Sequence, residues 1–341
     1  MTSKETIPVT VLTGFLGAGK TTLLNHILSQ QHGYKCAVII NEFGAIGIDG
    51  QLVVGIDEEI LELNNGCLCC RMRGDLIRSL SDLLNRQKRF DYVLIETTGL
   101  ADPAPIAQTF RSGELSDRLR LDGIITLIDA QHIEKELGDA PEATAQIAFA
   151  DVVLLNKTDL VGPAALEHIV SRLRRINALA QIHGTRQAEI DLVHILNIKA
   201  RELGGSFAMP EQPAEEPHEE HDHDHAHEHN EHHHAQDHAH HDERVKSLFL
   251  VDERPLELKK VEAWLTDVIR TMGPNIYRSK GILLLKGQAK RVVFQGVQMM
   301  FDAKLDRFWN PGEKRVNQIV FIGRELDEAA LRSGFEQCVA S

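Results

Sequence analysis

The 341-residue sequence contains no apolar run long enough to span a bilayer. Its first residues, MTSKETIPVTVL, lack the basic stretch and the following apolar stretch of a secretion signal. These two absences predict a cytoplasmic protein with no membrane partner. With 43% hydrophobic and 26% charged residues, the composition is that of a soluble folded protein, and the length favours two domains over one.

Basic residues are absent from one long stretch, and this explains most of the net charge of −13. Residues 211–243 hold 12 of the 50 acidic residues and none of the 37 Lys and Arg residues. Outside this stretch, 38 acidic and 37 basic residues nearly cancel. The sequence therefore has no general basic surface of the kind that binds nucleic acid, and we expect no nucleic-acid partner.

Cysteine is scarce, with five residues in the chain. Three of the five, Cys67, Cys69 and Cys70, fall within four positions, while Cys36 and Cys338 stand alone. In a long cytosolic chain, an odd number of clustered cysteines is typical of a metal or redox site and not of a disulfide framework.

Short apolar runs alternate with amphipathic stretches through the first 205 residues. The runs that we predict as strands are 7–12, 36–40, 92–95, 123–128 and 152–155. Helical spacing follows at 20–31 and again at 76–84. Continuous apolar strands that alternate with helices predict a three-layer α/β fold, with a parallel sheet covered on both faces.

The pattern changes twice after this first domain. Between 206 and 245 apolar residues nearly vanish, so this segment is predicted to be a disordered linker rich in His, Asp and Glu. From 246 to 341 a smaller α+β domain is expected. Its predicted helix covers 256–272, and its predicted strands are 247–251, 281–285, 291–297 and 318–323.

A glycine-rich turn joins the first predicted strand to the first predicted helix. The letters GFLGAGKT at 14–21 fit the P-loop pattern in the strand–turn–helix context that makes it specific. Backbone N–H groups and the helix N-terminus would hold phosphate oxygens there, with Lys20 on the β- and γ-phosphates and the Thr21 hydroxyl on Mg²⁺. The residues expected to contact the nucleotide in this loop are Gly14, Gly17, Ala18, Gly19, Lys20, Thr21 and Thr22.

Two later strand ends complete the expected nucleotide site. The run at 92–95 ends in Glu96, which we assign to the Mg²⁺ shell, and the N–H of Gly99 is expected near the γ-phosphate. NKTD follows the run at 152–155. Asp159 can accept hydrogen bonds from both N–H donors of guanine, which adenine lacks, so the pattern predicts GTP and GDP as ligands. Asn156 is expected at the base edge and Lys157 over the ring face.

The cysteine cluster lies in a polar loop that directly precedes the helical spacing at 76–84. A helix N-terminus and the neighbouring Arg71 and Arg73 lower thiol pKa values, and thiolates bind Zn²⁺. Cys67, Cys69 and Cys70 would leave a fourth coordination position open, which suits a site that releases its metal. Small buried hydrophobes and a redox pair are the alternatives.

In this order, TGFLGAGKTTLLNHIL, NEFGAIGID, NNGCLCC, ETTGLADP and NKTD resemble the CobW-type metallochaperone GTPases, and among them the YjiA-like group. The C-terminal letters YRSKGIL, FQGV and FIG resemble the C-terminal domain of that family. The resemblance covers essentially all of the chain outside 206–245. It implies a P-loop GTPase of the SIMIBI class that binds zinc, cobalt or nickel at the CxCC loop and transfers the metal to a client protein.

The sequence departs from this family where members often carry acidic residues. Ile40 and Ala45 occupy two such positions, so a fourth metal ligand must come from elsewhere. Glu42 is retained and is a candidate ligand, and Asp49 lies nearby in the expected switch I. Either carboxylate is also a candidate for orienting the attacking water, and we count Asp49 with Lys20, Thr21 and Glu96 as catalytic.

Twelve of the 18 histidines lie between His218 and His241, many of them alternating with acidic residues. Neutral imidazoles bind zinc, nickel and copper, so this tract is expected to bind metal and to raise its concentration near the cysteines. The alternative is a solvated spacer. His26, His168 and His183, outside the tract, are expected to be surface or packing residues.

No counterpart of the water-positioning glutamine of Ras-type GTPases is evident, so slow intrinsic hydrolysis is expected, with stimulation by a client or by dimerisation. A zinc buffer with incidental GTPase activity and a signalling GTPase with structural cysteines remain as alternatives. The sequence names neither the client nor the oligomeric state.

Overall fold

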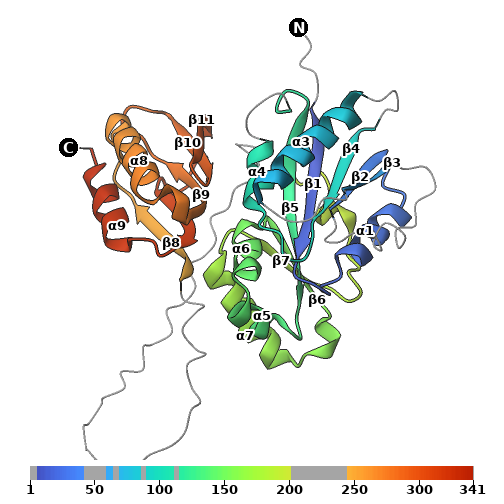
Figure 1. Cartoon of the computed structure of the whole chain (residues 1–341). Helices are drawn as coiled ribbons and strands as arrows, with labels where there is room; N and C mark the ends of the chain where they lie inside the picture. The colour runs from blue at the N-terminus through green and yellow to red at the C-terminus, as the bar shows by residue number, and fades with distance from the viewer. Residues whose placement is uncertain are drawn as a thin grey trace, which may run out of the picture.

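The computed structural model describes residues 6–41, 59–63, 69–85, 90–110, 115–200 and 244–340. These residues form an α/β domain with a parallel sheet, followed by a smaller α+β domain with an antiparallel sheet (Figure 1). The predicted fold class is confirmed. No helix within the described ranges has both the length and the apolarity of a membrane span.

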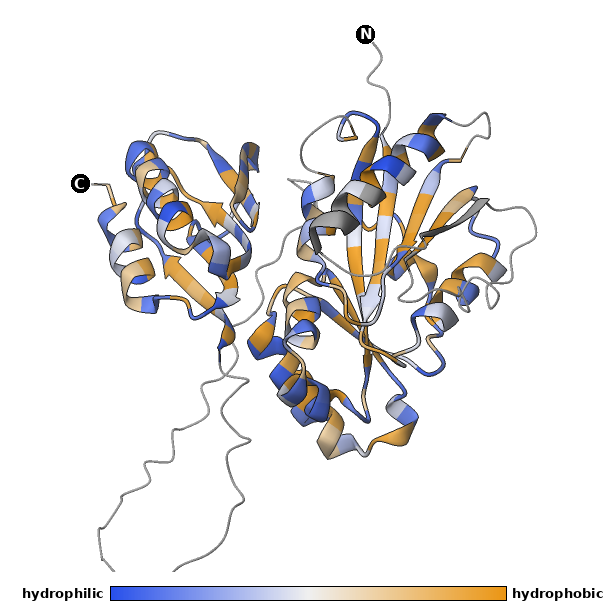
Figure 2. Cartoon of the chain, in the orientation of Figure 1, coloured by the Kyte–Doolittle hydropathy of each residue, from blue (hydrophilic) through white to orange (hydrophobic). Residues whose placement is uncertain are grey.

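The N-terminal sheet has seven strands in the order β3-β2-β4-β1-β5-β6-β7, and all of its pairings are parallel. Its strands are β1 (Ile7–Gly14), β2 (Cys36–Asn41), β3 (Glu59–Leu63), β4 (Tyr92–Glu96), β5 (Leu119–Asp129), β6 (Val152–Asn156) and β7 (Gln181–Gly184). The central strands are fully buried runs rich in β-branched residues, as expected for a sheet that is covered on both faces (Figure 2).

Helices cover the two faces of this sheet. They are α1 (Lys20–Ser29), α3 (Cys69–Asn85), α4 (Ala104–Thr109), α5 (Ile133–Asp139), α6 (Pro141–Phe149) and α7 (Pro163–Ile176), with 3-10 turns at Thr158–Leu160 and Leu192–His194. One hydrophobic cluster packs α1 and the chain around Ile195 onto one face. Two further clusters pack the other helices onto the opposite face.

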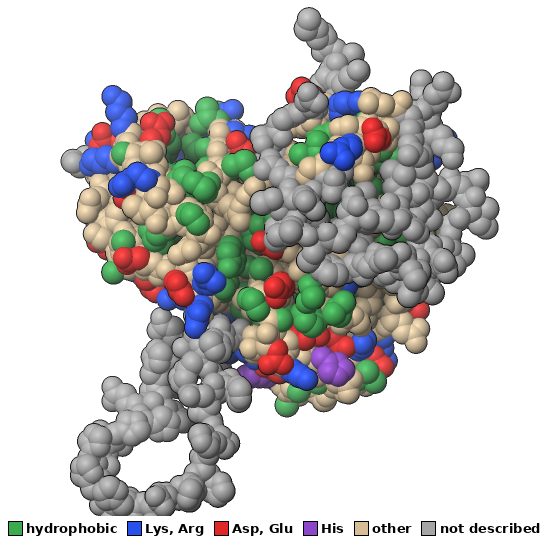
Figure 3. Space-filling model, viewed as in Figure 1, with side chains coloured by type: hydrophobic (Ala, Val, Ile, Leu, Met, Phe, Trp, Pro, Cys, Tyr) green, Lys and Arg blue, Asp and Glu red, His purple; other side chains and the backbone are tan. Residues whose placement is uncertain are grey.

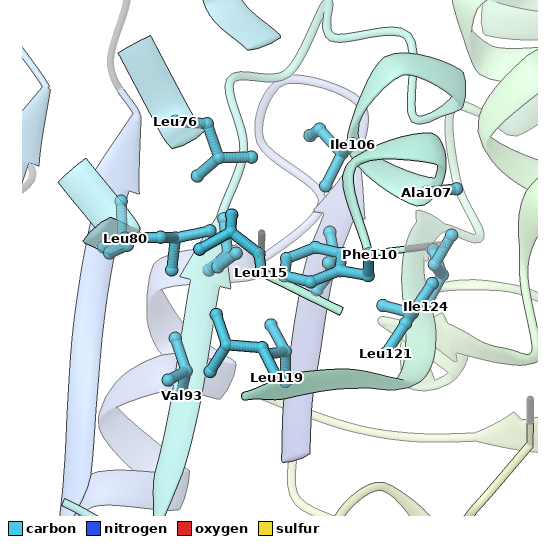
Figure 4. Packing of buried hydrophobic residues seen from close by; sticks show 14 of the residues in the cluster. Leu76, Leu80, Val93, Ile106, Ala107, Phe110, Leu115, Leu119, Leu121 and Ile124 are labelled. Atoms are coloured by element: carbon cyan, nitrogen blue, oxygen red, sulfur yellow. The ribbon is translucent and has the colours of Figure 1, made fainter. Parts of the chain in front are cut away.

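One of these clusters joins α3 and α4. Leu76 and Leu80 of α3 lie across Leu115 from Ile106 and Phe110 at α4 (Figure 4). The helix that begins at Cys69 therefore shares its core with the helix that follows the segment after Glu96.

The C-terminal sheet has five strands in the order β11-β10-β9-β12-β8. Its elements are β8 (Val245–Asp252), α8 (Leu258–Met272), a 3-10 turn (Gly273–Asn275), β9 (Ile276–Leu283), β10 (Lys290–Val297), β11 (Met300–Phe308), β12 (Asn317–Arg324) and α9 (Glu328–Gln337). Helices α8 and α9 pack on one face of this sheet around Trp264, Phe321 and Phe335.

The opposite face of the C-terminal sheet packs against the N-terminal domain. Phe249, Val320 and Ile322 belong to the same cluster as residues of α6 and α7, and Val297 belongs to the cluster under α3 and α4. Hydrophobic side chains line this seam in the space-filling view (Figure 3). The predicted domain border at 205 lies outside the described part, and the border at 246 lies in β8 (Val245–Asp252); both stay predictions.

Candidate nucleotide site and the approach to the cysteine cluster

The turn between β1 and α1 is built on glycines with positive φ angles. Gly14 has φ +135°, and a Cβ there would lie 2.2 Å from the backbone oxygen of Leu127. Gly19 has φ +109°, and a Cβ there would lie 2.7 Å from Asn156 Nδ2. Gly17 has φ +77° with open space around it. Only glycine fits the two close approaches, and the turn that results has the form of a phosphate cradle.

Lys20 is the first residue of α1, and its side chain folds back over the turn. Its Nζ donates to the carbonyl oxygens of Gly14 at 2.9 Å and Phe15 at 3.0 Å. An ammonium group held above the loop and the N-terminus of α1 gives the cradle positive potential. Ala18 is buried within the loop, and Thr22 is exposed beside it.

The predicted Mg²⁺ ligands lie side by side. Thr21 Oγ1 donates to Glu96 Oε1 at 2.8 Å, and Glu96 is only 2% exposed at the end of β4. A hydroxyl and a carboxylate beside a phosphate cradle are the hard oxygen donors that Mg²⁺ takes in such sites. The donor set therefore fits this ion.

Gly99 packs directly on the P-loop. A Cβ at Gly99 would lie 2.7 Å from the Leu16 amide nitrogen and in collision with the Leu16 side chain. Gln146 Nε2, from α6, donates to the carbonyl oxygens of Gly99 and Ala101, both at 3.1 Å. The segment after Glu96 is therefore held against the phosphate cradle from one side and anchored to α6 from the other.

Asn156 connects the P-loop to a loop that the sequence did not single out. Its Nδ2 donates to the Ala18 oxygen at 3.0 Å. Its Oδ1 accepts from the Ala188 amide at 2.9 Å and from Thr185 Oγ1 at 3.2 Å. The amide of Asn156 thus joins the P-loop to the loop at 185–188. The contact predicted between Asn156 and the base edge stays a prediction.

Lys157 and Asp159, which follow β6, have different surroundings. Lys157 has φ +61° and donates from Nζ to Asp129 Oδ2 at 2.6 Å. Burial alone would raise the pKa of Asp129, but hydrogen bonds from Lys157 and His132 outweigh it and hold that pKa below its usual range. Asp159 is exposed, as a residue that reads an incoming base must be.

A buried acid lies behind this ion pair. Glu136 of α5 is 8% exposed, and burial, together with the charge of Asp129, raises its pKa to about 7. Lys20 and Lys157 oppose that rise electrostatically, so Glu136 senses the charges of the nucleotide site.

The cysteine cluster meets the described structure only at its C-terminal end. Helix α3 begins at Cys69, so the backbone of Cys69 and Cys70 lies in its first turn. The side chains of these two residues, together with Cys67, Glu42 and Asp49, lie outside the described part. Within the described ranges, no group of three or more His, Cys, Asp or Glu residues is placed to hold a metal ion.

The two cysteines outside the cluster are buried. Cys36 and Cys338 form no disulfide, and burial raises the pKa of Cys338 to about 11. Ile40 is 2% exposed in the core under α1, so this position contributes no metal ligand.

Single histidines outside the tract have structural surroundings. His26 Nε2 lies 2.9 Å from the Ile190 oxygen. His183 lies in β7, with the centroid of its ring 4.7 Å from that of His194.

Three functional candidates were missed by the sequence reading. Thr185 and Ala188 bond to Asn156, and Gln146 bonds to the segment around Gly99. Gln146 lies in α6, and Thr185 and Ala188 lie in the loop after β7, and no sequence motif marks any of the three.

Comparison with known proteins places this arrangement in a family. Residues 8–184 match the CobW/HypB/UreG nucleotide-binding domain, and residues 245–339 match the cobalamin synthesis protein cobW C-terminal domain. The chain belongs to the CobW/HypB/UreG family. The resemblance drawn from the sequence motifs is thereby confirmed, and with it the P-loop GTPase fold.

Several relatives of this CobW-type chain carry a functional name. It is 38% identical to the zinc chaperone YjiA of Escherichia coli (strain K12), over 96% of this chain and 98% of YjiA. It is 32% identical to the zinc chaperone CobW of Pseudomonas aeruginosa, over 98% and 92% of the two chains. The zinc-regulated GTPase metalloprotein activator 1 of Schizosaccharomyces pombe is 40% identical, over 58% of this chain and half of its own length.

The fold has a close counterpart among solved structures. The crystal structure of zinc-bound YjiA GTPase from E. coli matches with a TM-score of 0.75 and 32% identity, covering 99% of this chain and all of that one. A zinc-bound YjiA variant with one glutamate and two cysteines replaced by alanine matches with a TM-score of 0.76.

Proposed function

We propose that this protein is a metallochaperone that binds and hydrolyses GTP, carries zinc at Cys67, Cys69 and Cys70, and delivers it to a client metalloprotein. The observation that carries this proposal is the shared core of α3 and α4. Helix α3 begins within the cysteine cluster, and α4 follows the segment around Gly99 that packs on the phosphate cradle. A shift of the segment around Gly99 on GTP binding would therefore pass through this shared core to α3, which begins at Cys69.

Different residues are proposed to bind the phosphates, the base and Mg²⁺ in the GTPase reaction. Lys20 lies over the cradle where the β- and γ-phosphates would bind, and Asp159 is free to read guanine. Thr21 and Glu96 would hold Mg²⁺, which supplies charge neutralisation for phosphoryl transfer. Asp49 or Glu42 is proposed to orient water, and hydrolysis without a client or a second copy of the chain is expected to be slow.

Zinc is the cargo that the relatives favour, since the similar YjiA and CobW proteins are named zinc chaperones. Cobalt and nickel, which thiolate and imidazole ligands also bind, are the alternative cargoes. Glu42 is the proposed further ligand because Ile40 is buried and apolar. The histidine tract at 218–241 is proposed to collect zinc in the cytoplasm and to supply the cysteines.

The test is the zinc affinity of the full chain, and of a form lacking residues 211–243, measured by chelator competition with GDP and with a non-hydrolysable GTP analogue. We expect a difference of tenfold or more between the two nucleotides, about 1.4 kcal/mol. The difference should vanish when Cys67, Cys69 and Cys70 become serine. Cys338→Ala is the matched control, because that thiol is buried away from the site.

The other outcomes separate the alternatives. Equal zinc affinity with both nucleotides would favour a zinc buffer over a GTP-gated chaperone. Loss of folding on cysteine substitution, with zinc affinity independent of nucleotide, would favour a signalling GTPase with structural cysteines. Unchanged zinc loading at limiting metal after deletion of 211–243 would leave the histidine tract as a spacer.

A further inference from the structure

One buried side chain fixes the backbone of the segment after Glu96. Gln146 is 1% exposed, and its Nε2 donates to both the Gly99 and the Ala101 carbonyl oxygens. Its own backbone oxygen accepts from Thr126 Oγ1 of β5 at 2.9 Å. Glycine has the widest backbone freedom of any residue, so a fixed carbonyl at Gly99 restricts where its peptide can point.

The helix that carries Gln146 is held at its C-terminal end by the C-terminal domain. Arg278 of β9 donates from Nη1 to the Ala150 oxygen and from Nη2 to Asp151 Oδ1 at 2.8 Å. Both side chains of this ion pair are less than 10% exposed. Asp151 Oδ2 also accepts from the Ile124 amide at 2.8 Å, so the pair is tied to the middle of β5.

A second contact reaches the segment from its other end. Gln108 of α4 donates to the Gln298 side chain in the turn between β10 and β11, and Val297 packs into the cluster under α4. Tyr277 stacks on Phe149 with ring centroids 5.5 Å apart. The C-terminal domain thus touches the helix that follows Gly99 and the helix that anchors Gly99.

We propose that Gln146 is a positioning residue for the γ-phosphate end of the GTP site, and that Arg278 couples the C-terminal domain to the same response. This rests on the proposed GTP site but not on zinc. When the backbone at Gly99 moves to meet a γ-phosphate, the hydrogen bonds from Gln146 to Gly99 and Ala101 shift α6 with it. The contact of Arg278 with the end of α6 then passes this shift to the C-terminal domain. Coupling is reciprocal, so a client on the C-terminal domain changes the preference for GTP over GDP.

The test uses the full chain without zinc, in Mg²⁺ buffer, with fluorescent GDP and a fluorescent non-hydrolysable GTP analogue. Gln146→Ala should weaken the analogue at least fivefold more than GDP. Arg278→Gln combined with Asp151→Asn, which removes both buried charges together, should change the ratio of the two affinities at least threefold. Thr144→Ala on the same helix and Arg270→Ala on α8 are the controls, with ratios within twofold of the wild type.

Equal weakening of both nucleotides by Gln146→Ala would overturn the positioning role and leave a structural one. An unchanged ratio in the Arg278/Asp151 variant would overturn the part of the C-terminal domain. If Gln146→Ala does not fold, Gln146→Met keeps the volume without the donor and is judged by the same ratio. If the wild-type protein bound neither nucleotide, the proposed GTP site itself would be wrong. Zinc is absent from this measurement, so its result does not depend on the proposed metal site.

Discussion

The P-loop offers a paired test, because Gly17 and Gly19 both have positive φ angles but differ in their surroundings. An alanine at Gly17 meets open space, so its cost is backbone strain alone, about 1–2 kcal/mol. An alanine at Gly19 carries similar or larger strain at φ +109°, and its Cβ lies 2.7 Å from Asn156 Nδ2. Displacing that amide breaks the bond to the Ala18 oxygen at 3.0 Å, which adds about 1–3 kcal/mol.

Gly19→Ala should therefore be less stable than Gly17→Ala by about 2 kcal/mol, or roughly 3 °C in melting temperature for a chain of 341 residues. The assay is thermal unfolding without nucleotide or Mg²⁺, because a bound phosphate would add its own clash at both positions. Adding Asn156→Ala to Gly19→Ala removes the collision, so the two changes together should cost less than the sum of their separate effects.

Equal melting temperatures for the two alanine variants would refute the reasoning. So would full additivity of Gly19→Ala and Asn156→Ala. Either result would mean that Asn156 moves aside freely and does not join the P-loop to the loop at 185–188.

Three further predictions follow from the same region. Asp159→Asn should lower GTP affinity by about 100-fold and gain affinity for a xanthine nucleotide, whose second carbonyl accepts from the new amide; competition binding measures both, and unchanged GTP affinity would contradict the assigned base contact. Thr21→Val should reduce Mg²⁺-dependent GTP hydrolysis by about 100-fold while Thr21→Ser keeps the hydroxyl and most of the rate; equal activity of the two in a phosphate-release assay would remove Thr21 from the Mg²⁺ shell. Burial raises the Glu136 pKa from 4.5 to about 7, so its contribution to stability is complete below pH 4.5 and is lost as pH rises through 7. At pH 8 the free energy of unfolding of Glu136→Gln should then exceed that of the wild type by about 1–2 kcal/mol, and the difference should close toward pH 4.5. Thermal unfolding across this pH range measures it, and a difference independent of pH would show that Glu136 does not titrate in this range.

In the N-terminal sheet, the sequence predicted the five strands that lie between the two edge strands. The predicted apolar runs fall within β1, β2, β4, β5 and β6, and each strand extends beyond its run by one to a few residues. In the C-terminal sheet the edge strand β8 was also predicted, from its apolar run at 247–251. The edge strands β3 (EILEL), β7 (QIHG) and β11 (MFDAKLDRF) were missed. An edge strand has one open side, so its sequence needs fewer apolar residues and gives a weaker signal.

Helix α9 was missed for a different reason. Its sequence EAALRSGFEQ contains Gly334, which disfavours a helix when it is judged locally. A Cβ at Gly334 would lie 2.4 Å from the Trp264 ring of α8, so the glycine is required by the packing of the two helices. The packing of α9 on α8 thus requires a glycine at position 334, although local propensity marks this residue as a helix breaker.

The same distinction separates the site residues that could be predicted from those that could not. Lys20 and Thr21 lie in a loop whose own sequence sets its shape, and Glu96 follows an apolar strand, so motif spacing was enough to predict them as candidates. Gln146 lies in PEATAQIAF, a helix with no motif, and its proposed role depends on the packing of α6 beside residues 99–101. Since Gly99 is held by a residue that local sequence cannot mark, further residues that shape the proposed GTP site should be sought by their spatial contact with residues 97–103.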